Sequence, residues 1–177
     1  MHLNSLNLMK EFLKELPDKE LKILDVGSQV VDGQEHFGSY RQFFPNKKWQ
    51  YIGTDVVEGN NVDVVMEPYK IPFPDEYFDW VISGQTLEHV EFPWELVKEM
   101  ARVLKVNGTM IVIAPAKIGI HRFPIDAYRF YPDGMVALCK WAGLKPLKSR
   151  RSFADQNTVD TYLIATKNDK IHTLLHG

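Results

Sequence analysis

Hydrophobic and polar residues follow one another in blocks that predict helices and strands in turn. The chain opens with apolar residues at every third or fourth position, which indicates an amphipathic helix ending near Pro17: Leu3, Leu6, Met9, Leu13 and Leu16. Short apolar runs that predict buried strands cover residues 21–26, 49–54, 62–66, 78–83, 110–114 and 162–166, with a weaker candidate at 144–149. Two more helices are predicted, one on a face formed by Trp94, Val97, Ala101 and Leu104 and closed by Asn107-Gly108, the other from Pro132-Asp133 to Gly143.

The order of these elements predicts the fold class. Continuous apolar strands that alternate with helices indicate a parallel sheet covered on both faces, so we expect an α/β, doubly wound fold. The chain has 177 residues, and roughly 150 residues make up one domain. We therefore expect a single domain over residues 1–177, with its N-terminal helix at about 3–16.

Composition narrows the classes of function. Hydrophobic residues make up 45% and charged residues 25%, which is typical of a globular domain. A net charge of -2 gives no electrostatic reason to expect a nucleic-acid partner. The start of the chain lacks the pattern of a signal peptide, and no apolar run approaches the roughly 20 residues of a membrane helix. With a single cysteine, Cys139, this predicts a cytoplasmic protein with no membrane association.

Polar residues and glycines follow the predicted strands, where open α/β sheets bind ligands. They are Asp25, Gly27, Ser28 and Gly33 after the first strand, Asp55 after the second, Glu67 after the third and Gln85 after the fourth. A glycine here allows close approach of the backbone to a ligand, and Asp55 is suited to two ribose hydroxyls. Each residue also has an ordinary interpretation as a turn glycine, a helix cap or a solvated charge.

Several stretches together resemble one family, the class I S-adenosylmethionine-dependent methyltransferases of the type 11 branch. They are Ile23–Gly27, Ile71–Asp75 leading into Phe78-Asp79, Leu87–Val90 and Glu99–Lys105, and the resemblance runs from about residue 21 to residue 143. The resemblance implies a seven-stranded, mostly parallel sheet with an antiparallel last strand, which residues 162–166 would supply.

The resemblance also implies S-adenosylmethionine as cofactor, bound in a cofactor half at about residues 21–90. It assigns Asp25 and Gly27 to the methionine end, Asp55 to the ribose and Glu67 to the adenine edge. Gln85 would lie beside the methyl donor. These roles are expectations carried over from the family, position by position.

The chain departs from the family in the loop after the first strand. Glycines are usual where Gln29 and Val31 stand, and side chains there would narrow the path to the methionine moiety. Ser28, Gly33 and the segment 39–41 are expected to give the loop a different route around the same ligand. Loss of cofactor binding is the alternative, and would leave a non-catalytic binding or scaffold domain.

A polar and aromatic loop at about residues 116–134 is the expected acceptor side. It resembles the same segment of methyltransferases associated with glycan assembly, which favours a sugar or glycan hydroxyl as the small-molecule acceptor. Such a hydroxyl needs a proton acceptor, for which His121 is the first candidate. Asp126 would orient His121 or act as the base itself, and His89 is the alternative base. The alternatives to a catalytic role are that His89 packs at the start of its helix and that Asp126 and Arg129 form a surface ion pair.

Other features leave alternatives open. Arg122 and Arg129 are candidates to clamp an anionic group, and four aromatic residues either stack on a sugar, cover the cofactor or fill the sheet edge: Phe123, Tyr128, Phe130 and Tyr131. No His/Cys cluster has metal-ligand spacing, so no metal is expected, although scattered carboxylates leave Mg²⁺ open.

The leading hypothesis is thus an O-methyltransferase, with a homodimer or a partner domain as candidates to complete its small acceptor site. A nicotinamide-dependent oxidoreductase is poorly supported, because the loop lacks the Gly-x-Gly-x-x-Gly pattern.

Overall fold

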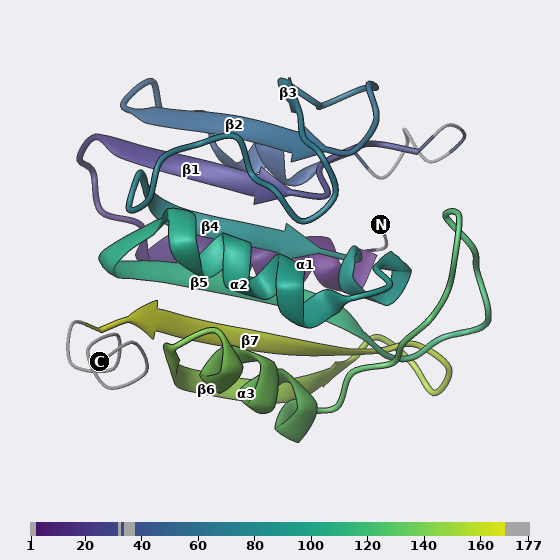
Figure 1. Ribbon diagram of the computed structural model, residues 1–177. Helices are drawn as coiled ribbons and strands as arrows, with labels where there is room; N and C mark the ends of the chain where they lie inside the picture. Colours follow the sequence, from purple (N-terminus) through teal and green to yellow (C-terminus); the bar gives the residue numbers. More distant parts are fainter. Residues whose placement is uncertain (1–2, 32, 34–37, 169–177) are drawn as a thin grey trace.

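A computed structural model describes residues 3–31, 33 and 38–168 and contains one seven-stranded sheet in the order β3-β2-β1-β4-β5-β7-β6 (Figure 1). The strands are β1 (Leu21–Val26), β2 (Trp49–Asp55), β3 (Val64–Val65), β4 (Phe78–Gly84), β5 (Leu104–Lys117), β6 (Leu144–Phe153) and β7 (Val159–Lys167). The helices are α1 (Leu3–Phe12), α2 (Pro93–Val103) and α3 (Pro132–Trp141), with 3₁₀ turns η1 (Leu13–Glu15), η3 (Tyr40–Phe43) and η4 (Leu87–His89).

The strand pairing confirms the predicted doubly wound sheet. β1 pairs in parallel with β2 on one side and with β4 on the other, so the strand order reverses between β1 and β4. β7 runs antiparallel to both of its neighbours, β5 and β6, as the resemblance implied. Open α/β sheets bind ligands at the carboxyl ends of the strands beside such a reversal, which directs attention to the ends of β1 and β4.

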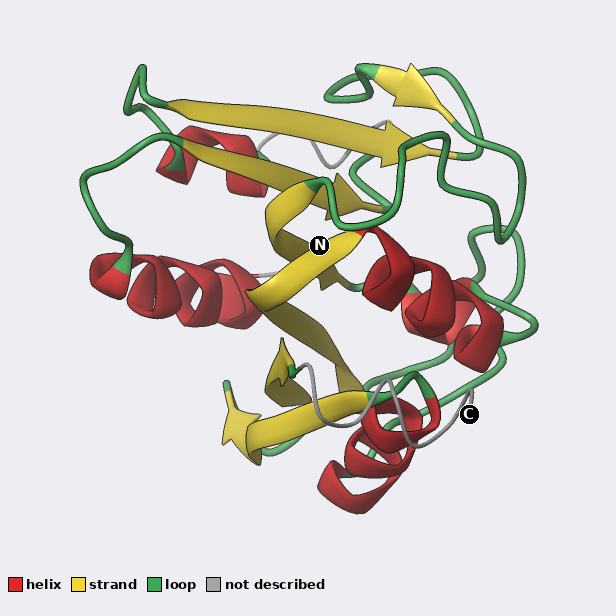
Figure 2. Ribbon diagram, turned by 60° about the vertical axis from the view of Figure 1, so that its left-hand side comes forward, coloured by secondary structure: helices red, strands yellow, loops and turns green. Residues whose placement is uncertain are grey.

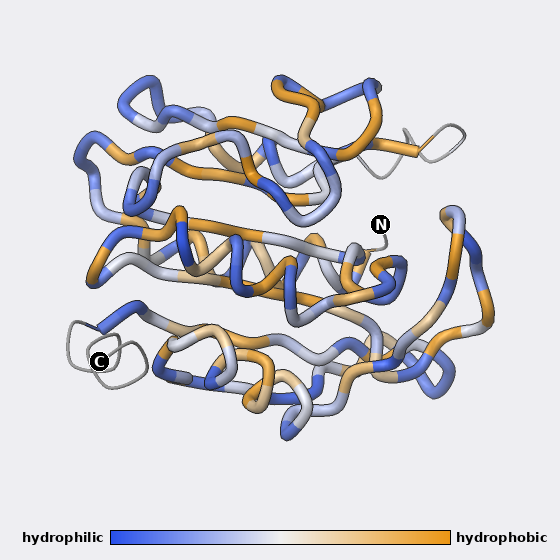
Figure 3. The backbone as a smooth tube through the Cα atoms, in the orientation of Figure 1, coloured by the Kyte–Doolittle hydropathy of each residue, from blue (hydrophilic) through white to orange (hydrophobic). Residues whose placement is uncertain are grey.

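Helices cover both faces of the sheet (Figure 2). α1 packs its buried Leu6 and Met9 against apolar side chains of β1, β4 and β5. α2 and α3 cover the opposite face, where the larger cluster of buried apolar residues lies. The central strands are accordingly hydrophobic along much of their length, and polar stretches gather in the connections (Figure 3). None of the helices in the described part of the chain is both long and apolar enough to span a membrane.

The helix after β4 differs from its prediction. α2 ends at Val103, not at Asn107-Gly108, and its exposed Trp94 does not belong to the buried face. Leu104 is fully buried and pairs with Phe78, so the chain is already extended there. Asn107, at φ 60°, instead interrupts β5 before regular pairing resumes. The third predicted run is also shorter than expected, with only Val64–Val65 forming β3.

Arg102 near the end of α2 holds the loop before β4 in place. Its guanidinium donates to the carbonyl oxygens of Ile71, at 2.8 Å, and Phe73, at 2.9 Å. It also bonds the carboxylates of Glu99, at 2.8 Å, and Asp75, at 2.7 Å. These contacts of Arg102 therefore join two of the stretches that carry the family resemblance, Ile71–Asp75 and Glu99–Lys105.

Candidate functional site

A cavity of about 380 Å³ lies at the carboxyl ends of β1, β2 and β4, beside the reversal in strand order. Its walls come from the loops after those strands and from the predicted acceptor-side loop. Side chains and backbone that line it include Gly27, Gln29, Asp55, Gln85, His89 and Phe123. The cavity thus brings together residues that the sequence analysis assigned separately to cofactor and acceptor.

Gly27 turns the chain sharply as it leaves β1. Its φ of +76° lies in the left-handed region, which glycine adopts without strain. A β-carbon built on it would lie 2.2 Å from the hydroxyl oxygen of Thr86, so no side chain fits between the two loops. Gly27 therefore brings bare backbone to the cavity wall.

Gln29 and Val31 replace the usual glycines without filling the cavity. Both residues line it, but the side chain of Gln29 lies over Gly59, where a built β-carbon would approach its amide nitrogen to 2.6 Å. The glutamine side chain thus packs along the loop after β2, and a cavity of about 380 Å³ is present with both replacements in its wall.

Asp55 ends β2 with its carboxylate anchored at the cavity wall. One oxygen accepts the backbone N–H of Gln29 at 3.1 Å, and the other accepts that of Val56 at 2.8 Å. A carboxylate oxygen has two lone pairs, so each oxygen can accept a further hydrogen bond. Asp55 is fixed in position and able to bind two hydroxyl groups.

Gln85 follows β4 and presents an unpaired acceptor. Its φ is +57°, and its amide nitrogen donates to Asp160 of β7 at 3.0 Å. Asp160 in turn accepts a bond from Asn4 of α1 at 2.6 Å. The side-chain oxygen of Gln85 is buried and has no hydrogen-bond partner among the described residues. It is a natural acceptor for a donor group on a ligand in the cavity.

Four other predicted cofactor residues do not line the cavity. Asp25 is buried and accepts a hydrogen bond from the hydroxyl of Tyr51, and burial raises the pKa of its carboxyl to about 7. Ser28 donates to the carbonyl oxygen of Asn61 at 3.0 Å, and Gly33 is exposed. Glu67 is exposed beside the cavity-lining Met66 and pairs with Lys70 at 3.4 Å. Their roles in cofactor binding stay predictions.

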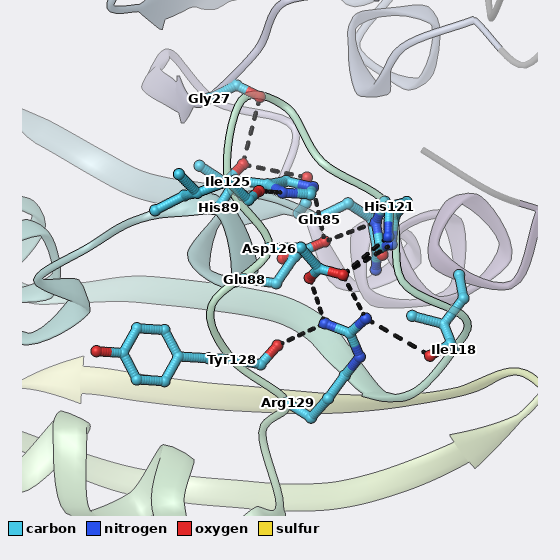
Figure 4. A network of polar contacts seen from close by, with 12 residues as sticks. Gly27, Gln85, Glu88, His89, Ile118, His121, Ile125, Asp126, Tyr128 and Arg129 are labelled. Carbon is cyan, nitrogen blue, oxygen red and sulfur yellow. Dashed lines mark hydrogen bonds and ion pairs between the residues drawn. The ribbon is translucent and has the colours of Figure 1, made fainter.

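A cluster of ionisable side chains adjoins the cavity (Figure 4). His89 lines the cavity from η4, and its ring lies edge-on to that of His121, with centroids 4.8 Å apart. Oε1 of Glu88 lies 3.7 Å from Nε2 of His89 and 3.9 Å from Nε2 of His121. Burial raises the pKa of Glu88 to about 8 and lowers that of His89. Burial thus favours the uncharged form of both Glu88 and His89.

The carboxylate of Asp126 holds the backbone of His121 and so fixes this side of the cluster. Its carboxylate, 1% exposed, accepts the backbone N–H of His121 at 2.8 Å and is clasped by Arg129 at 2.5 and 2.8 Å. The Arg129 hydrogen bonds hold the pKa of Asp126 well below its ordinary value. The Asp126–Arg129 pair is therefore a partly buried ion pair that fixes the loop, with the Asp126 carboxylate covered and Arg129 23% exposed.

The aromatic residues of the loop divide between the cavity and the core. Phe123 lines the cavity, whereas Phe130 is 7% exposed and belongs to the core. Tyr128 donates to the carbonyl oxygen of Glu91 at 3.0 Å, and Tyr131 is exposed. Phe123 is thus the aromatic residue of these four that can contact a bound ligand there.

Glu88 is the site residue that sequence reasoning missed. It lies inside a stretch that carries the family resemblance, and its neighbour His89 was a candidate. A glutamate at the start of a helix is usually solvated, and only the fold shows that this one is fully buried. Its position directly before a histidine, after a strand, was the available signal.

The fold is that of class I S-adenosylmethionine-dependent methyltransferases. Residues 37–112, less than half of the chain, match the model of a methyltransferase domain family. The family match and the fold support a methyltransferase domain and indicate S-adenosylmethionine as its cofactor.

Relatives of known name match parts of the chain. The 2-methyl-6-phytyl-1,4-hydroquinone methyltransferase 2 of Oryza sativa subsp. japonica is 29% identical over 103 residues, 56% of this chain and 28% of that protein. The ubiquinone/menaquinone biosynthesis C-methyltransferase UbiE of Pseudomonas putida (strain GB-1) is 27% identical over 130 residues, 68% of this chain and 50% of that protein. The chain thus spans half or less of the length of these relatives.

A solved structure shares the fold over most of both chains. The 1,6-didemethyltoxoflavin-N1-methyltransferase of Burkholderia thailandensis, solved with 1,6-didemethyltoxoflavin and S-adenosylhomocysteine, superposes with a TM-score of 0.71 at 13% identity. The alignment covers 93% of this chain and 79% of that one. At this identity the likeness concerns the fold alone.

Proposed function

We propose that this chain is an S-adenosylmethionine-dependent methyltransferase that methylates a hydroxyl group of a small molecule, with a sugar or glycan as the first acceptor class. The observation that carries the proposal is the continuity of the cavity, which runs from Gly27 and Asp55 to His89. One end has the groups to hold a nucleoside and an amino acid, and the other has groups to accept a proton.

The residues of the cavity fit the cofactor. Asp55 has free lone pairs on both oxygens for the two ribose hydroxyls, and the bare backbone at Gly27 lets a ligand approach closely. The unpaired oxygen of Gln85 would accept from the cofactor's ammonium group. An unsatisfied buried acceptor costs about 1–3 kcal/mol, which a donor on the ligand would recover. When bound, S-adenosylmethionine supplies an electrophilic methyl group on a positively charged sulfur.

Proton acceptance belongs to the histidine cluster in this proposal. His89 reaches the cavity itself, and its lowered pKa keeps the imidazole neutral, and thus able to accept a proton, at neutral pH. His121 lies behind it and stays the first candidate base of the sequence analysis. Asp126 acts as a positioning residue, because its strongly lowered pKa and the Arg129 clasp make it a poor base.

Hydroquinone C-methylation is the second candidate, favoured by two observations. The names of the two relatives describe methylation of a hydroquinone and C-methylation. The acceptor end of the cavity is also largely apolar, since Phe123, Pro124 and Ile125 line it beside Val90. Both acceptor classes carry a hydroxyl whose proton the cluster would accept.

The experiment that tests the proposal has two stages. Calorimetric titration with S-adenosylmethionine and S-adenosylhomocysteine should give binding of one equivalent of each. Incubation with ¹³C-methyl-labelled cofactor and a panel of sugars, nucleotide sugars and hydroquinones should then give a labelled product. The ¹³C chemical shift separates an O-methyl from a C-methyl product. A folded sample that binds neither compound would instead favour the non-catalytic scaffold.

A further inference from the structure

Glu88, His89 and His121 point three potential metal ligands at one place. One ligand atom from each residue lies within 4.8 Å of the other two, and Figure 4 shows the three side chains converging from η4 and from the 116–134 loop. The Glu88 Oε1 to histidine Nε2 distances are 3.7 and 3.9 Å. In a tetrahedral zinc site with bonds of roughly 2.0–2.1 Å, neighbouring ligand atoms lie about 3.3 Å apart. The two Glu88–histidine distances would have to shorten by about half an ångström, and a pair as far apart as 4.8 Å by about 1.5 Å, to close the cluster around an ion.

Both histidines are held in the tautomer that metal ligation requires. Nδ1 of His89 lies 2.7 Å from the carbonyl oxygen of Ile125, and Nδ1 of His121 lies 3.1 Å from that of Gly119. Because a carbonyl oxygen only accepts, each Nδ1 carries a hydrogen, and in the neutral imidazole Nε2 then has the free lone pair. Ligating histidines typically donate their second nitrogen to a carbonyl or carboxylate in this way, which fixes the ring orientation.

Glu88 supplies the second, independent observation. Its side chain is fully buried, and neither carboxylate oxygen has a hydrogen-bond partner among the described residues. A buried carboxylate without partners is costly, and such groups are usually paired or bound to a cation. Arg129 is directed to Asp126, and Asp160 of β7 adds negative charge nearby. Arg129 thus acts on Glu88 through its charge alone, and among the described residues no cation donates a hydrogen bond to the Glu88 carboxylate where the ligand atoms meet.

We propose that Glu88, His89 and His121 bind one divalent transition-metal ion. Two imidazoles and one carboxylate suit Zn²⁺, Fe²⁺, Co²⁺ or Ni²⁺ better than Ca²⁺ or Mg²⁺, which prefer oxygen ligands. No metal was expected from the sequence, because α2 and β5 separate His121 from Glu88-His89 and no compact ligand spacing exists.

The role of the ion rests on the proposed function. Three protein ligands leave coordination positions open, and His89 lines the cavity. An ion held there would bind the acceptor's hydroxyl oxygen and lower the pKa of that hydroxyl, a task otherwise left to a histidine base.

Metal binding is tested directly on the full chain, without any acceptor. The protein is stripped with EDTA, dialysed, and titrated with Co²⁺ by visible absorption and with Zn²⁺ by calorimetry. The wild type should bind one equivalent of each. Glu88→Gln and His121→Gln should each weaken binding by more than the 10–100-fold that loss of an outer partner costs. Melting curves confirm that each variant is folded.

Matched controls separate this site from adventitious binding. A His172→Gln/His176→Gln double variant removes two histidines outside the described residues, and Glu58→Gln removes an exposed carboxylate. Both should bind the metal like the wild type. Equal affinity in wild type, Glu88→Gln and His121→Gln would overturn the proposal, as would no binding by the folded wild type. Cofactor titration of the same samples distinguishes failure of the metal site from failure of the methyltransferase proposal.

Discussion

Gly27 and Thr86 lie against each other where the loops after β1 and β4 meet, leaving no room for a β-carbon at position 27. The three side-chain atoms of Thr86 nearest to such a carbon lie at 2.2, 2.3 and 2.8 Å. This contact joins the two loops on either side of the reversal in strand order. The two loops are therefore packed tightly against each other at the cavity wall.

Gly27→Ala should lower both stability and cofactor affinity. The substitution adds strain at φ +76° and a clash with Thr86, so its cost should exceed the roughly 1 kcal/mol typical of alanine at a left-handed position. Gly33→Ala is the matched control, because φ is +82° there and no atom of the described residues lies within 4 Å of a built β-carbon. Urea unfolding and cofactor titration compare the two. Equal losses in both variants would mean that the Thr86 contact has no effect.

Asp55→Ala should weaken S-adenosylmethionine binding by about 10–100-fold, since hydrogen bonds to a charged group contribute roughly 1.5–3 kcal/mol. Asp55→Asn keeps the size of the side chain and tests whether the charge matters. Glu67→Gln is a useful comparison, because the exposed Glu67 does not line the cavity. Calorimetry gives the affinities, and unchanged binding by folded Asp55→Ala would remove Asp55 from the ribose role.

His121→Ala should reduce methyl transfer by at least about 100-fold while changing cofactor affinity little. General base catalysis typically contributes 10²–10⁴-fold, and His121 is not among the residues that line the cofactor cavity. Arg122→Ala changes the exposed neighbouring residue and should keep its activity. Single-turnover rates with labelled cofactor provide the measurement. Full activity in His121→Ala would leave His89 as the candidate base.

We expect the free energy of unfolding to decrease as the pH rises from about 4 to about 7. The reason is that, in this range, the folded protein keeps a proton on the buried carboxyl of Asp25 that the unfolded chain has lost. Its pKa is about 7 in the folded protein against an ordinary value of 3.8, mainly because burial disfavours the charge. Tyr51 and Arg41 favour the charged form, and Asp55 opposes it. In this window the folded state binds the extra proton, so the free energy of unfolding decreases by at most about 1.4 kcal/mol per pH unit.

Asp25→Asn provides the comparison, because its amide oxygen can still accept from the Tyr51 hydroxyl. Urea unfolding of both proteins at several pH values, with a chelator present, isolates the contribution of Asp25. The wild type should lose stability relative to the variant between pH 4 and 7 and level off above. A difference that stays constant with pH would show that Asp25 has an ordinary pKa in the folded state.

The strands of the fold could be predicted because their burial on both faces leaves continuous apolar runs. The run at 21–26 matches β1 at both ends, and β7 extends the last predicted run by a few residues. The end of α2 could not be predicted, because Leu104 satisfies a helical pattern as well as a strand pattern. Its pairing with Phe78, a tertiary contact, decides between them.

The site could be predicted only in outline. Asp55, Gln85 and His89 were found because ligand-binding residues follow strands. Glu88 was missed because its burial depends on packing between η4 and the 116–134 loop, which no local pattern reveals. The position of the Gln29 side chain could not be predicted either, because it lies over Gly59, which is thirty positions further along the chain.

The hydrogen bonds that Asn4 and Gln85 both donate to Asp160 have a consequence for biosynthesis. Asn4 and Asp160 are 156 positions apart, and Gln85 lies 75 positions before Asp160. During translation, the first strands leave the ribosome long before β7 exists, so Gln85 has no anchor at that stage. A nascent chain can pair β1 with β2 early, but it acquires a finished ligand cavity only after β7 has inserted between β5 and β6. Competence to bind ligand is therefore a late step in the folding of each molecule, which has to wait for the synthesis of β7.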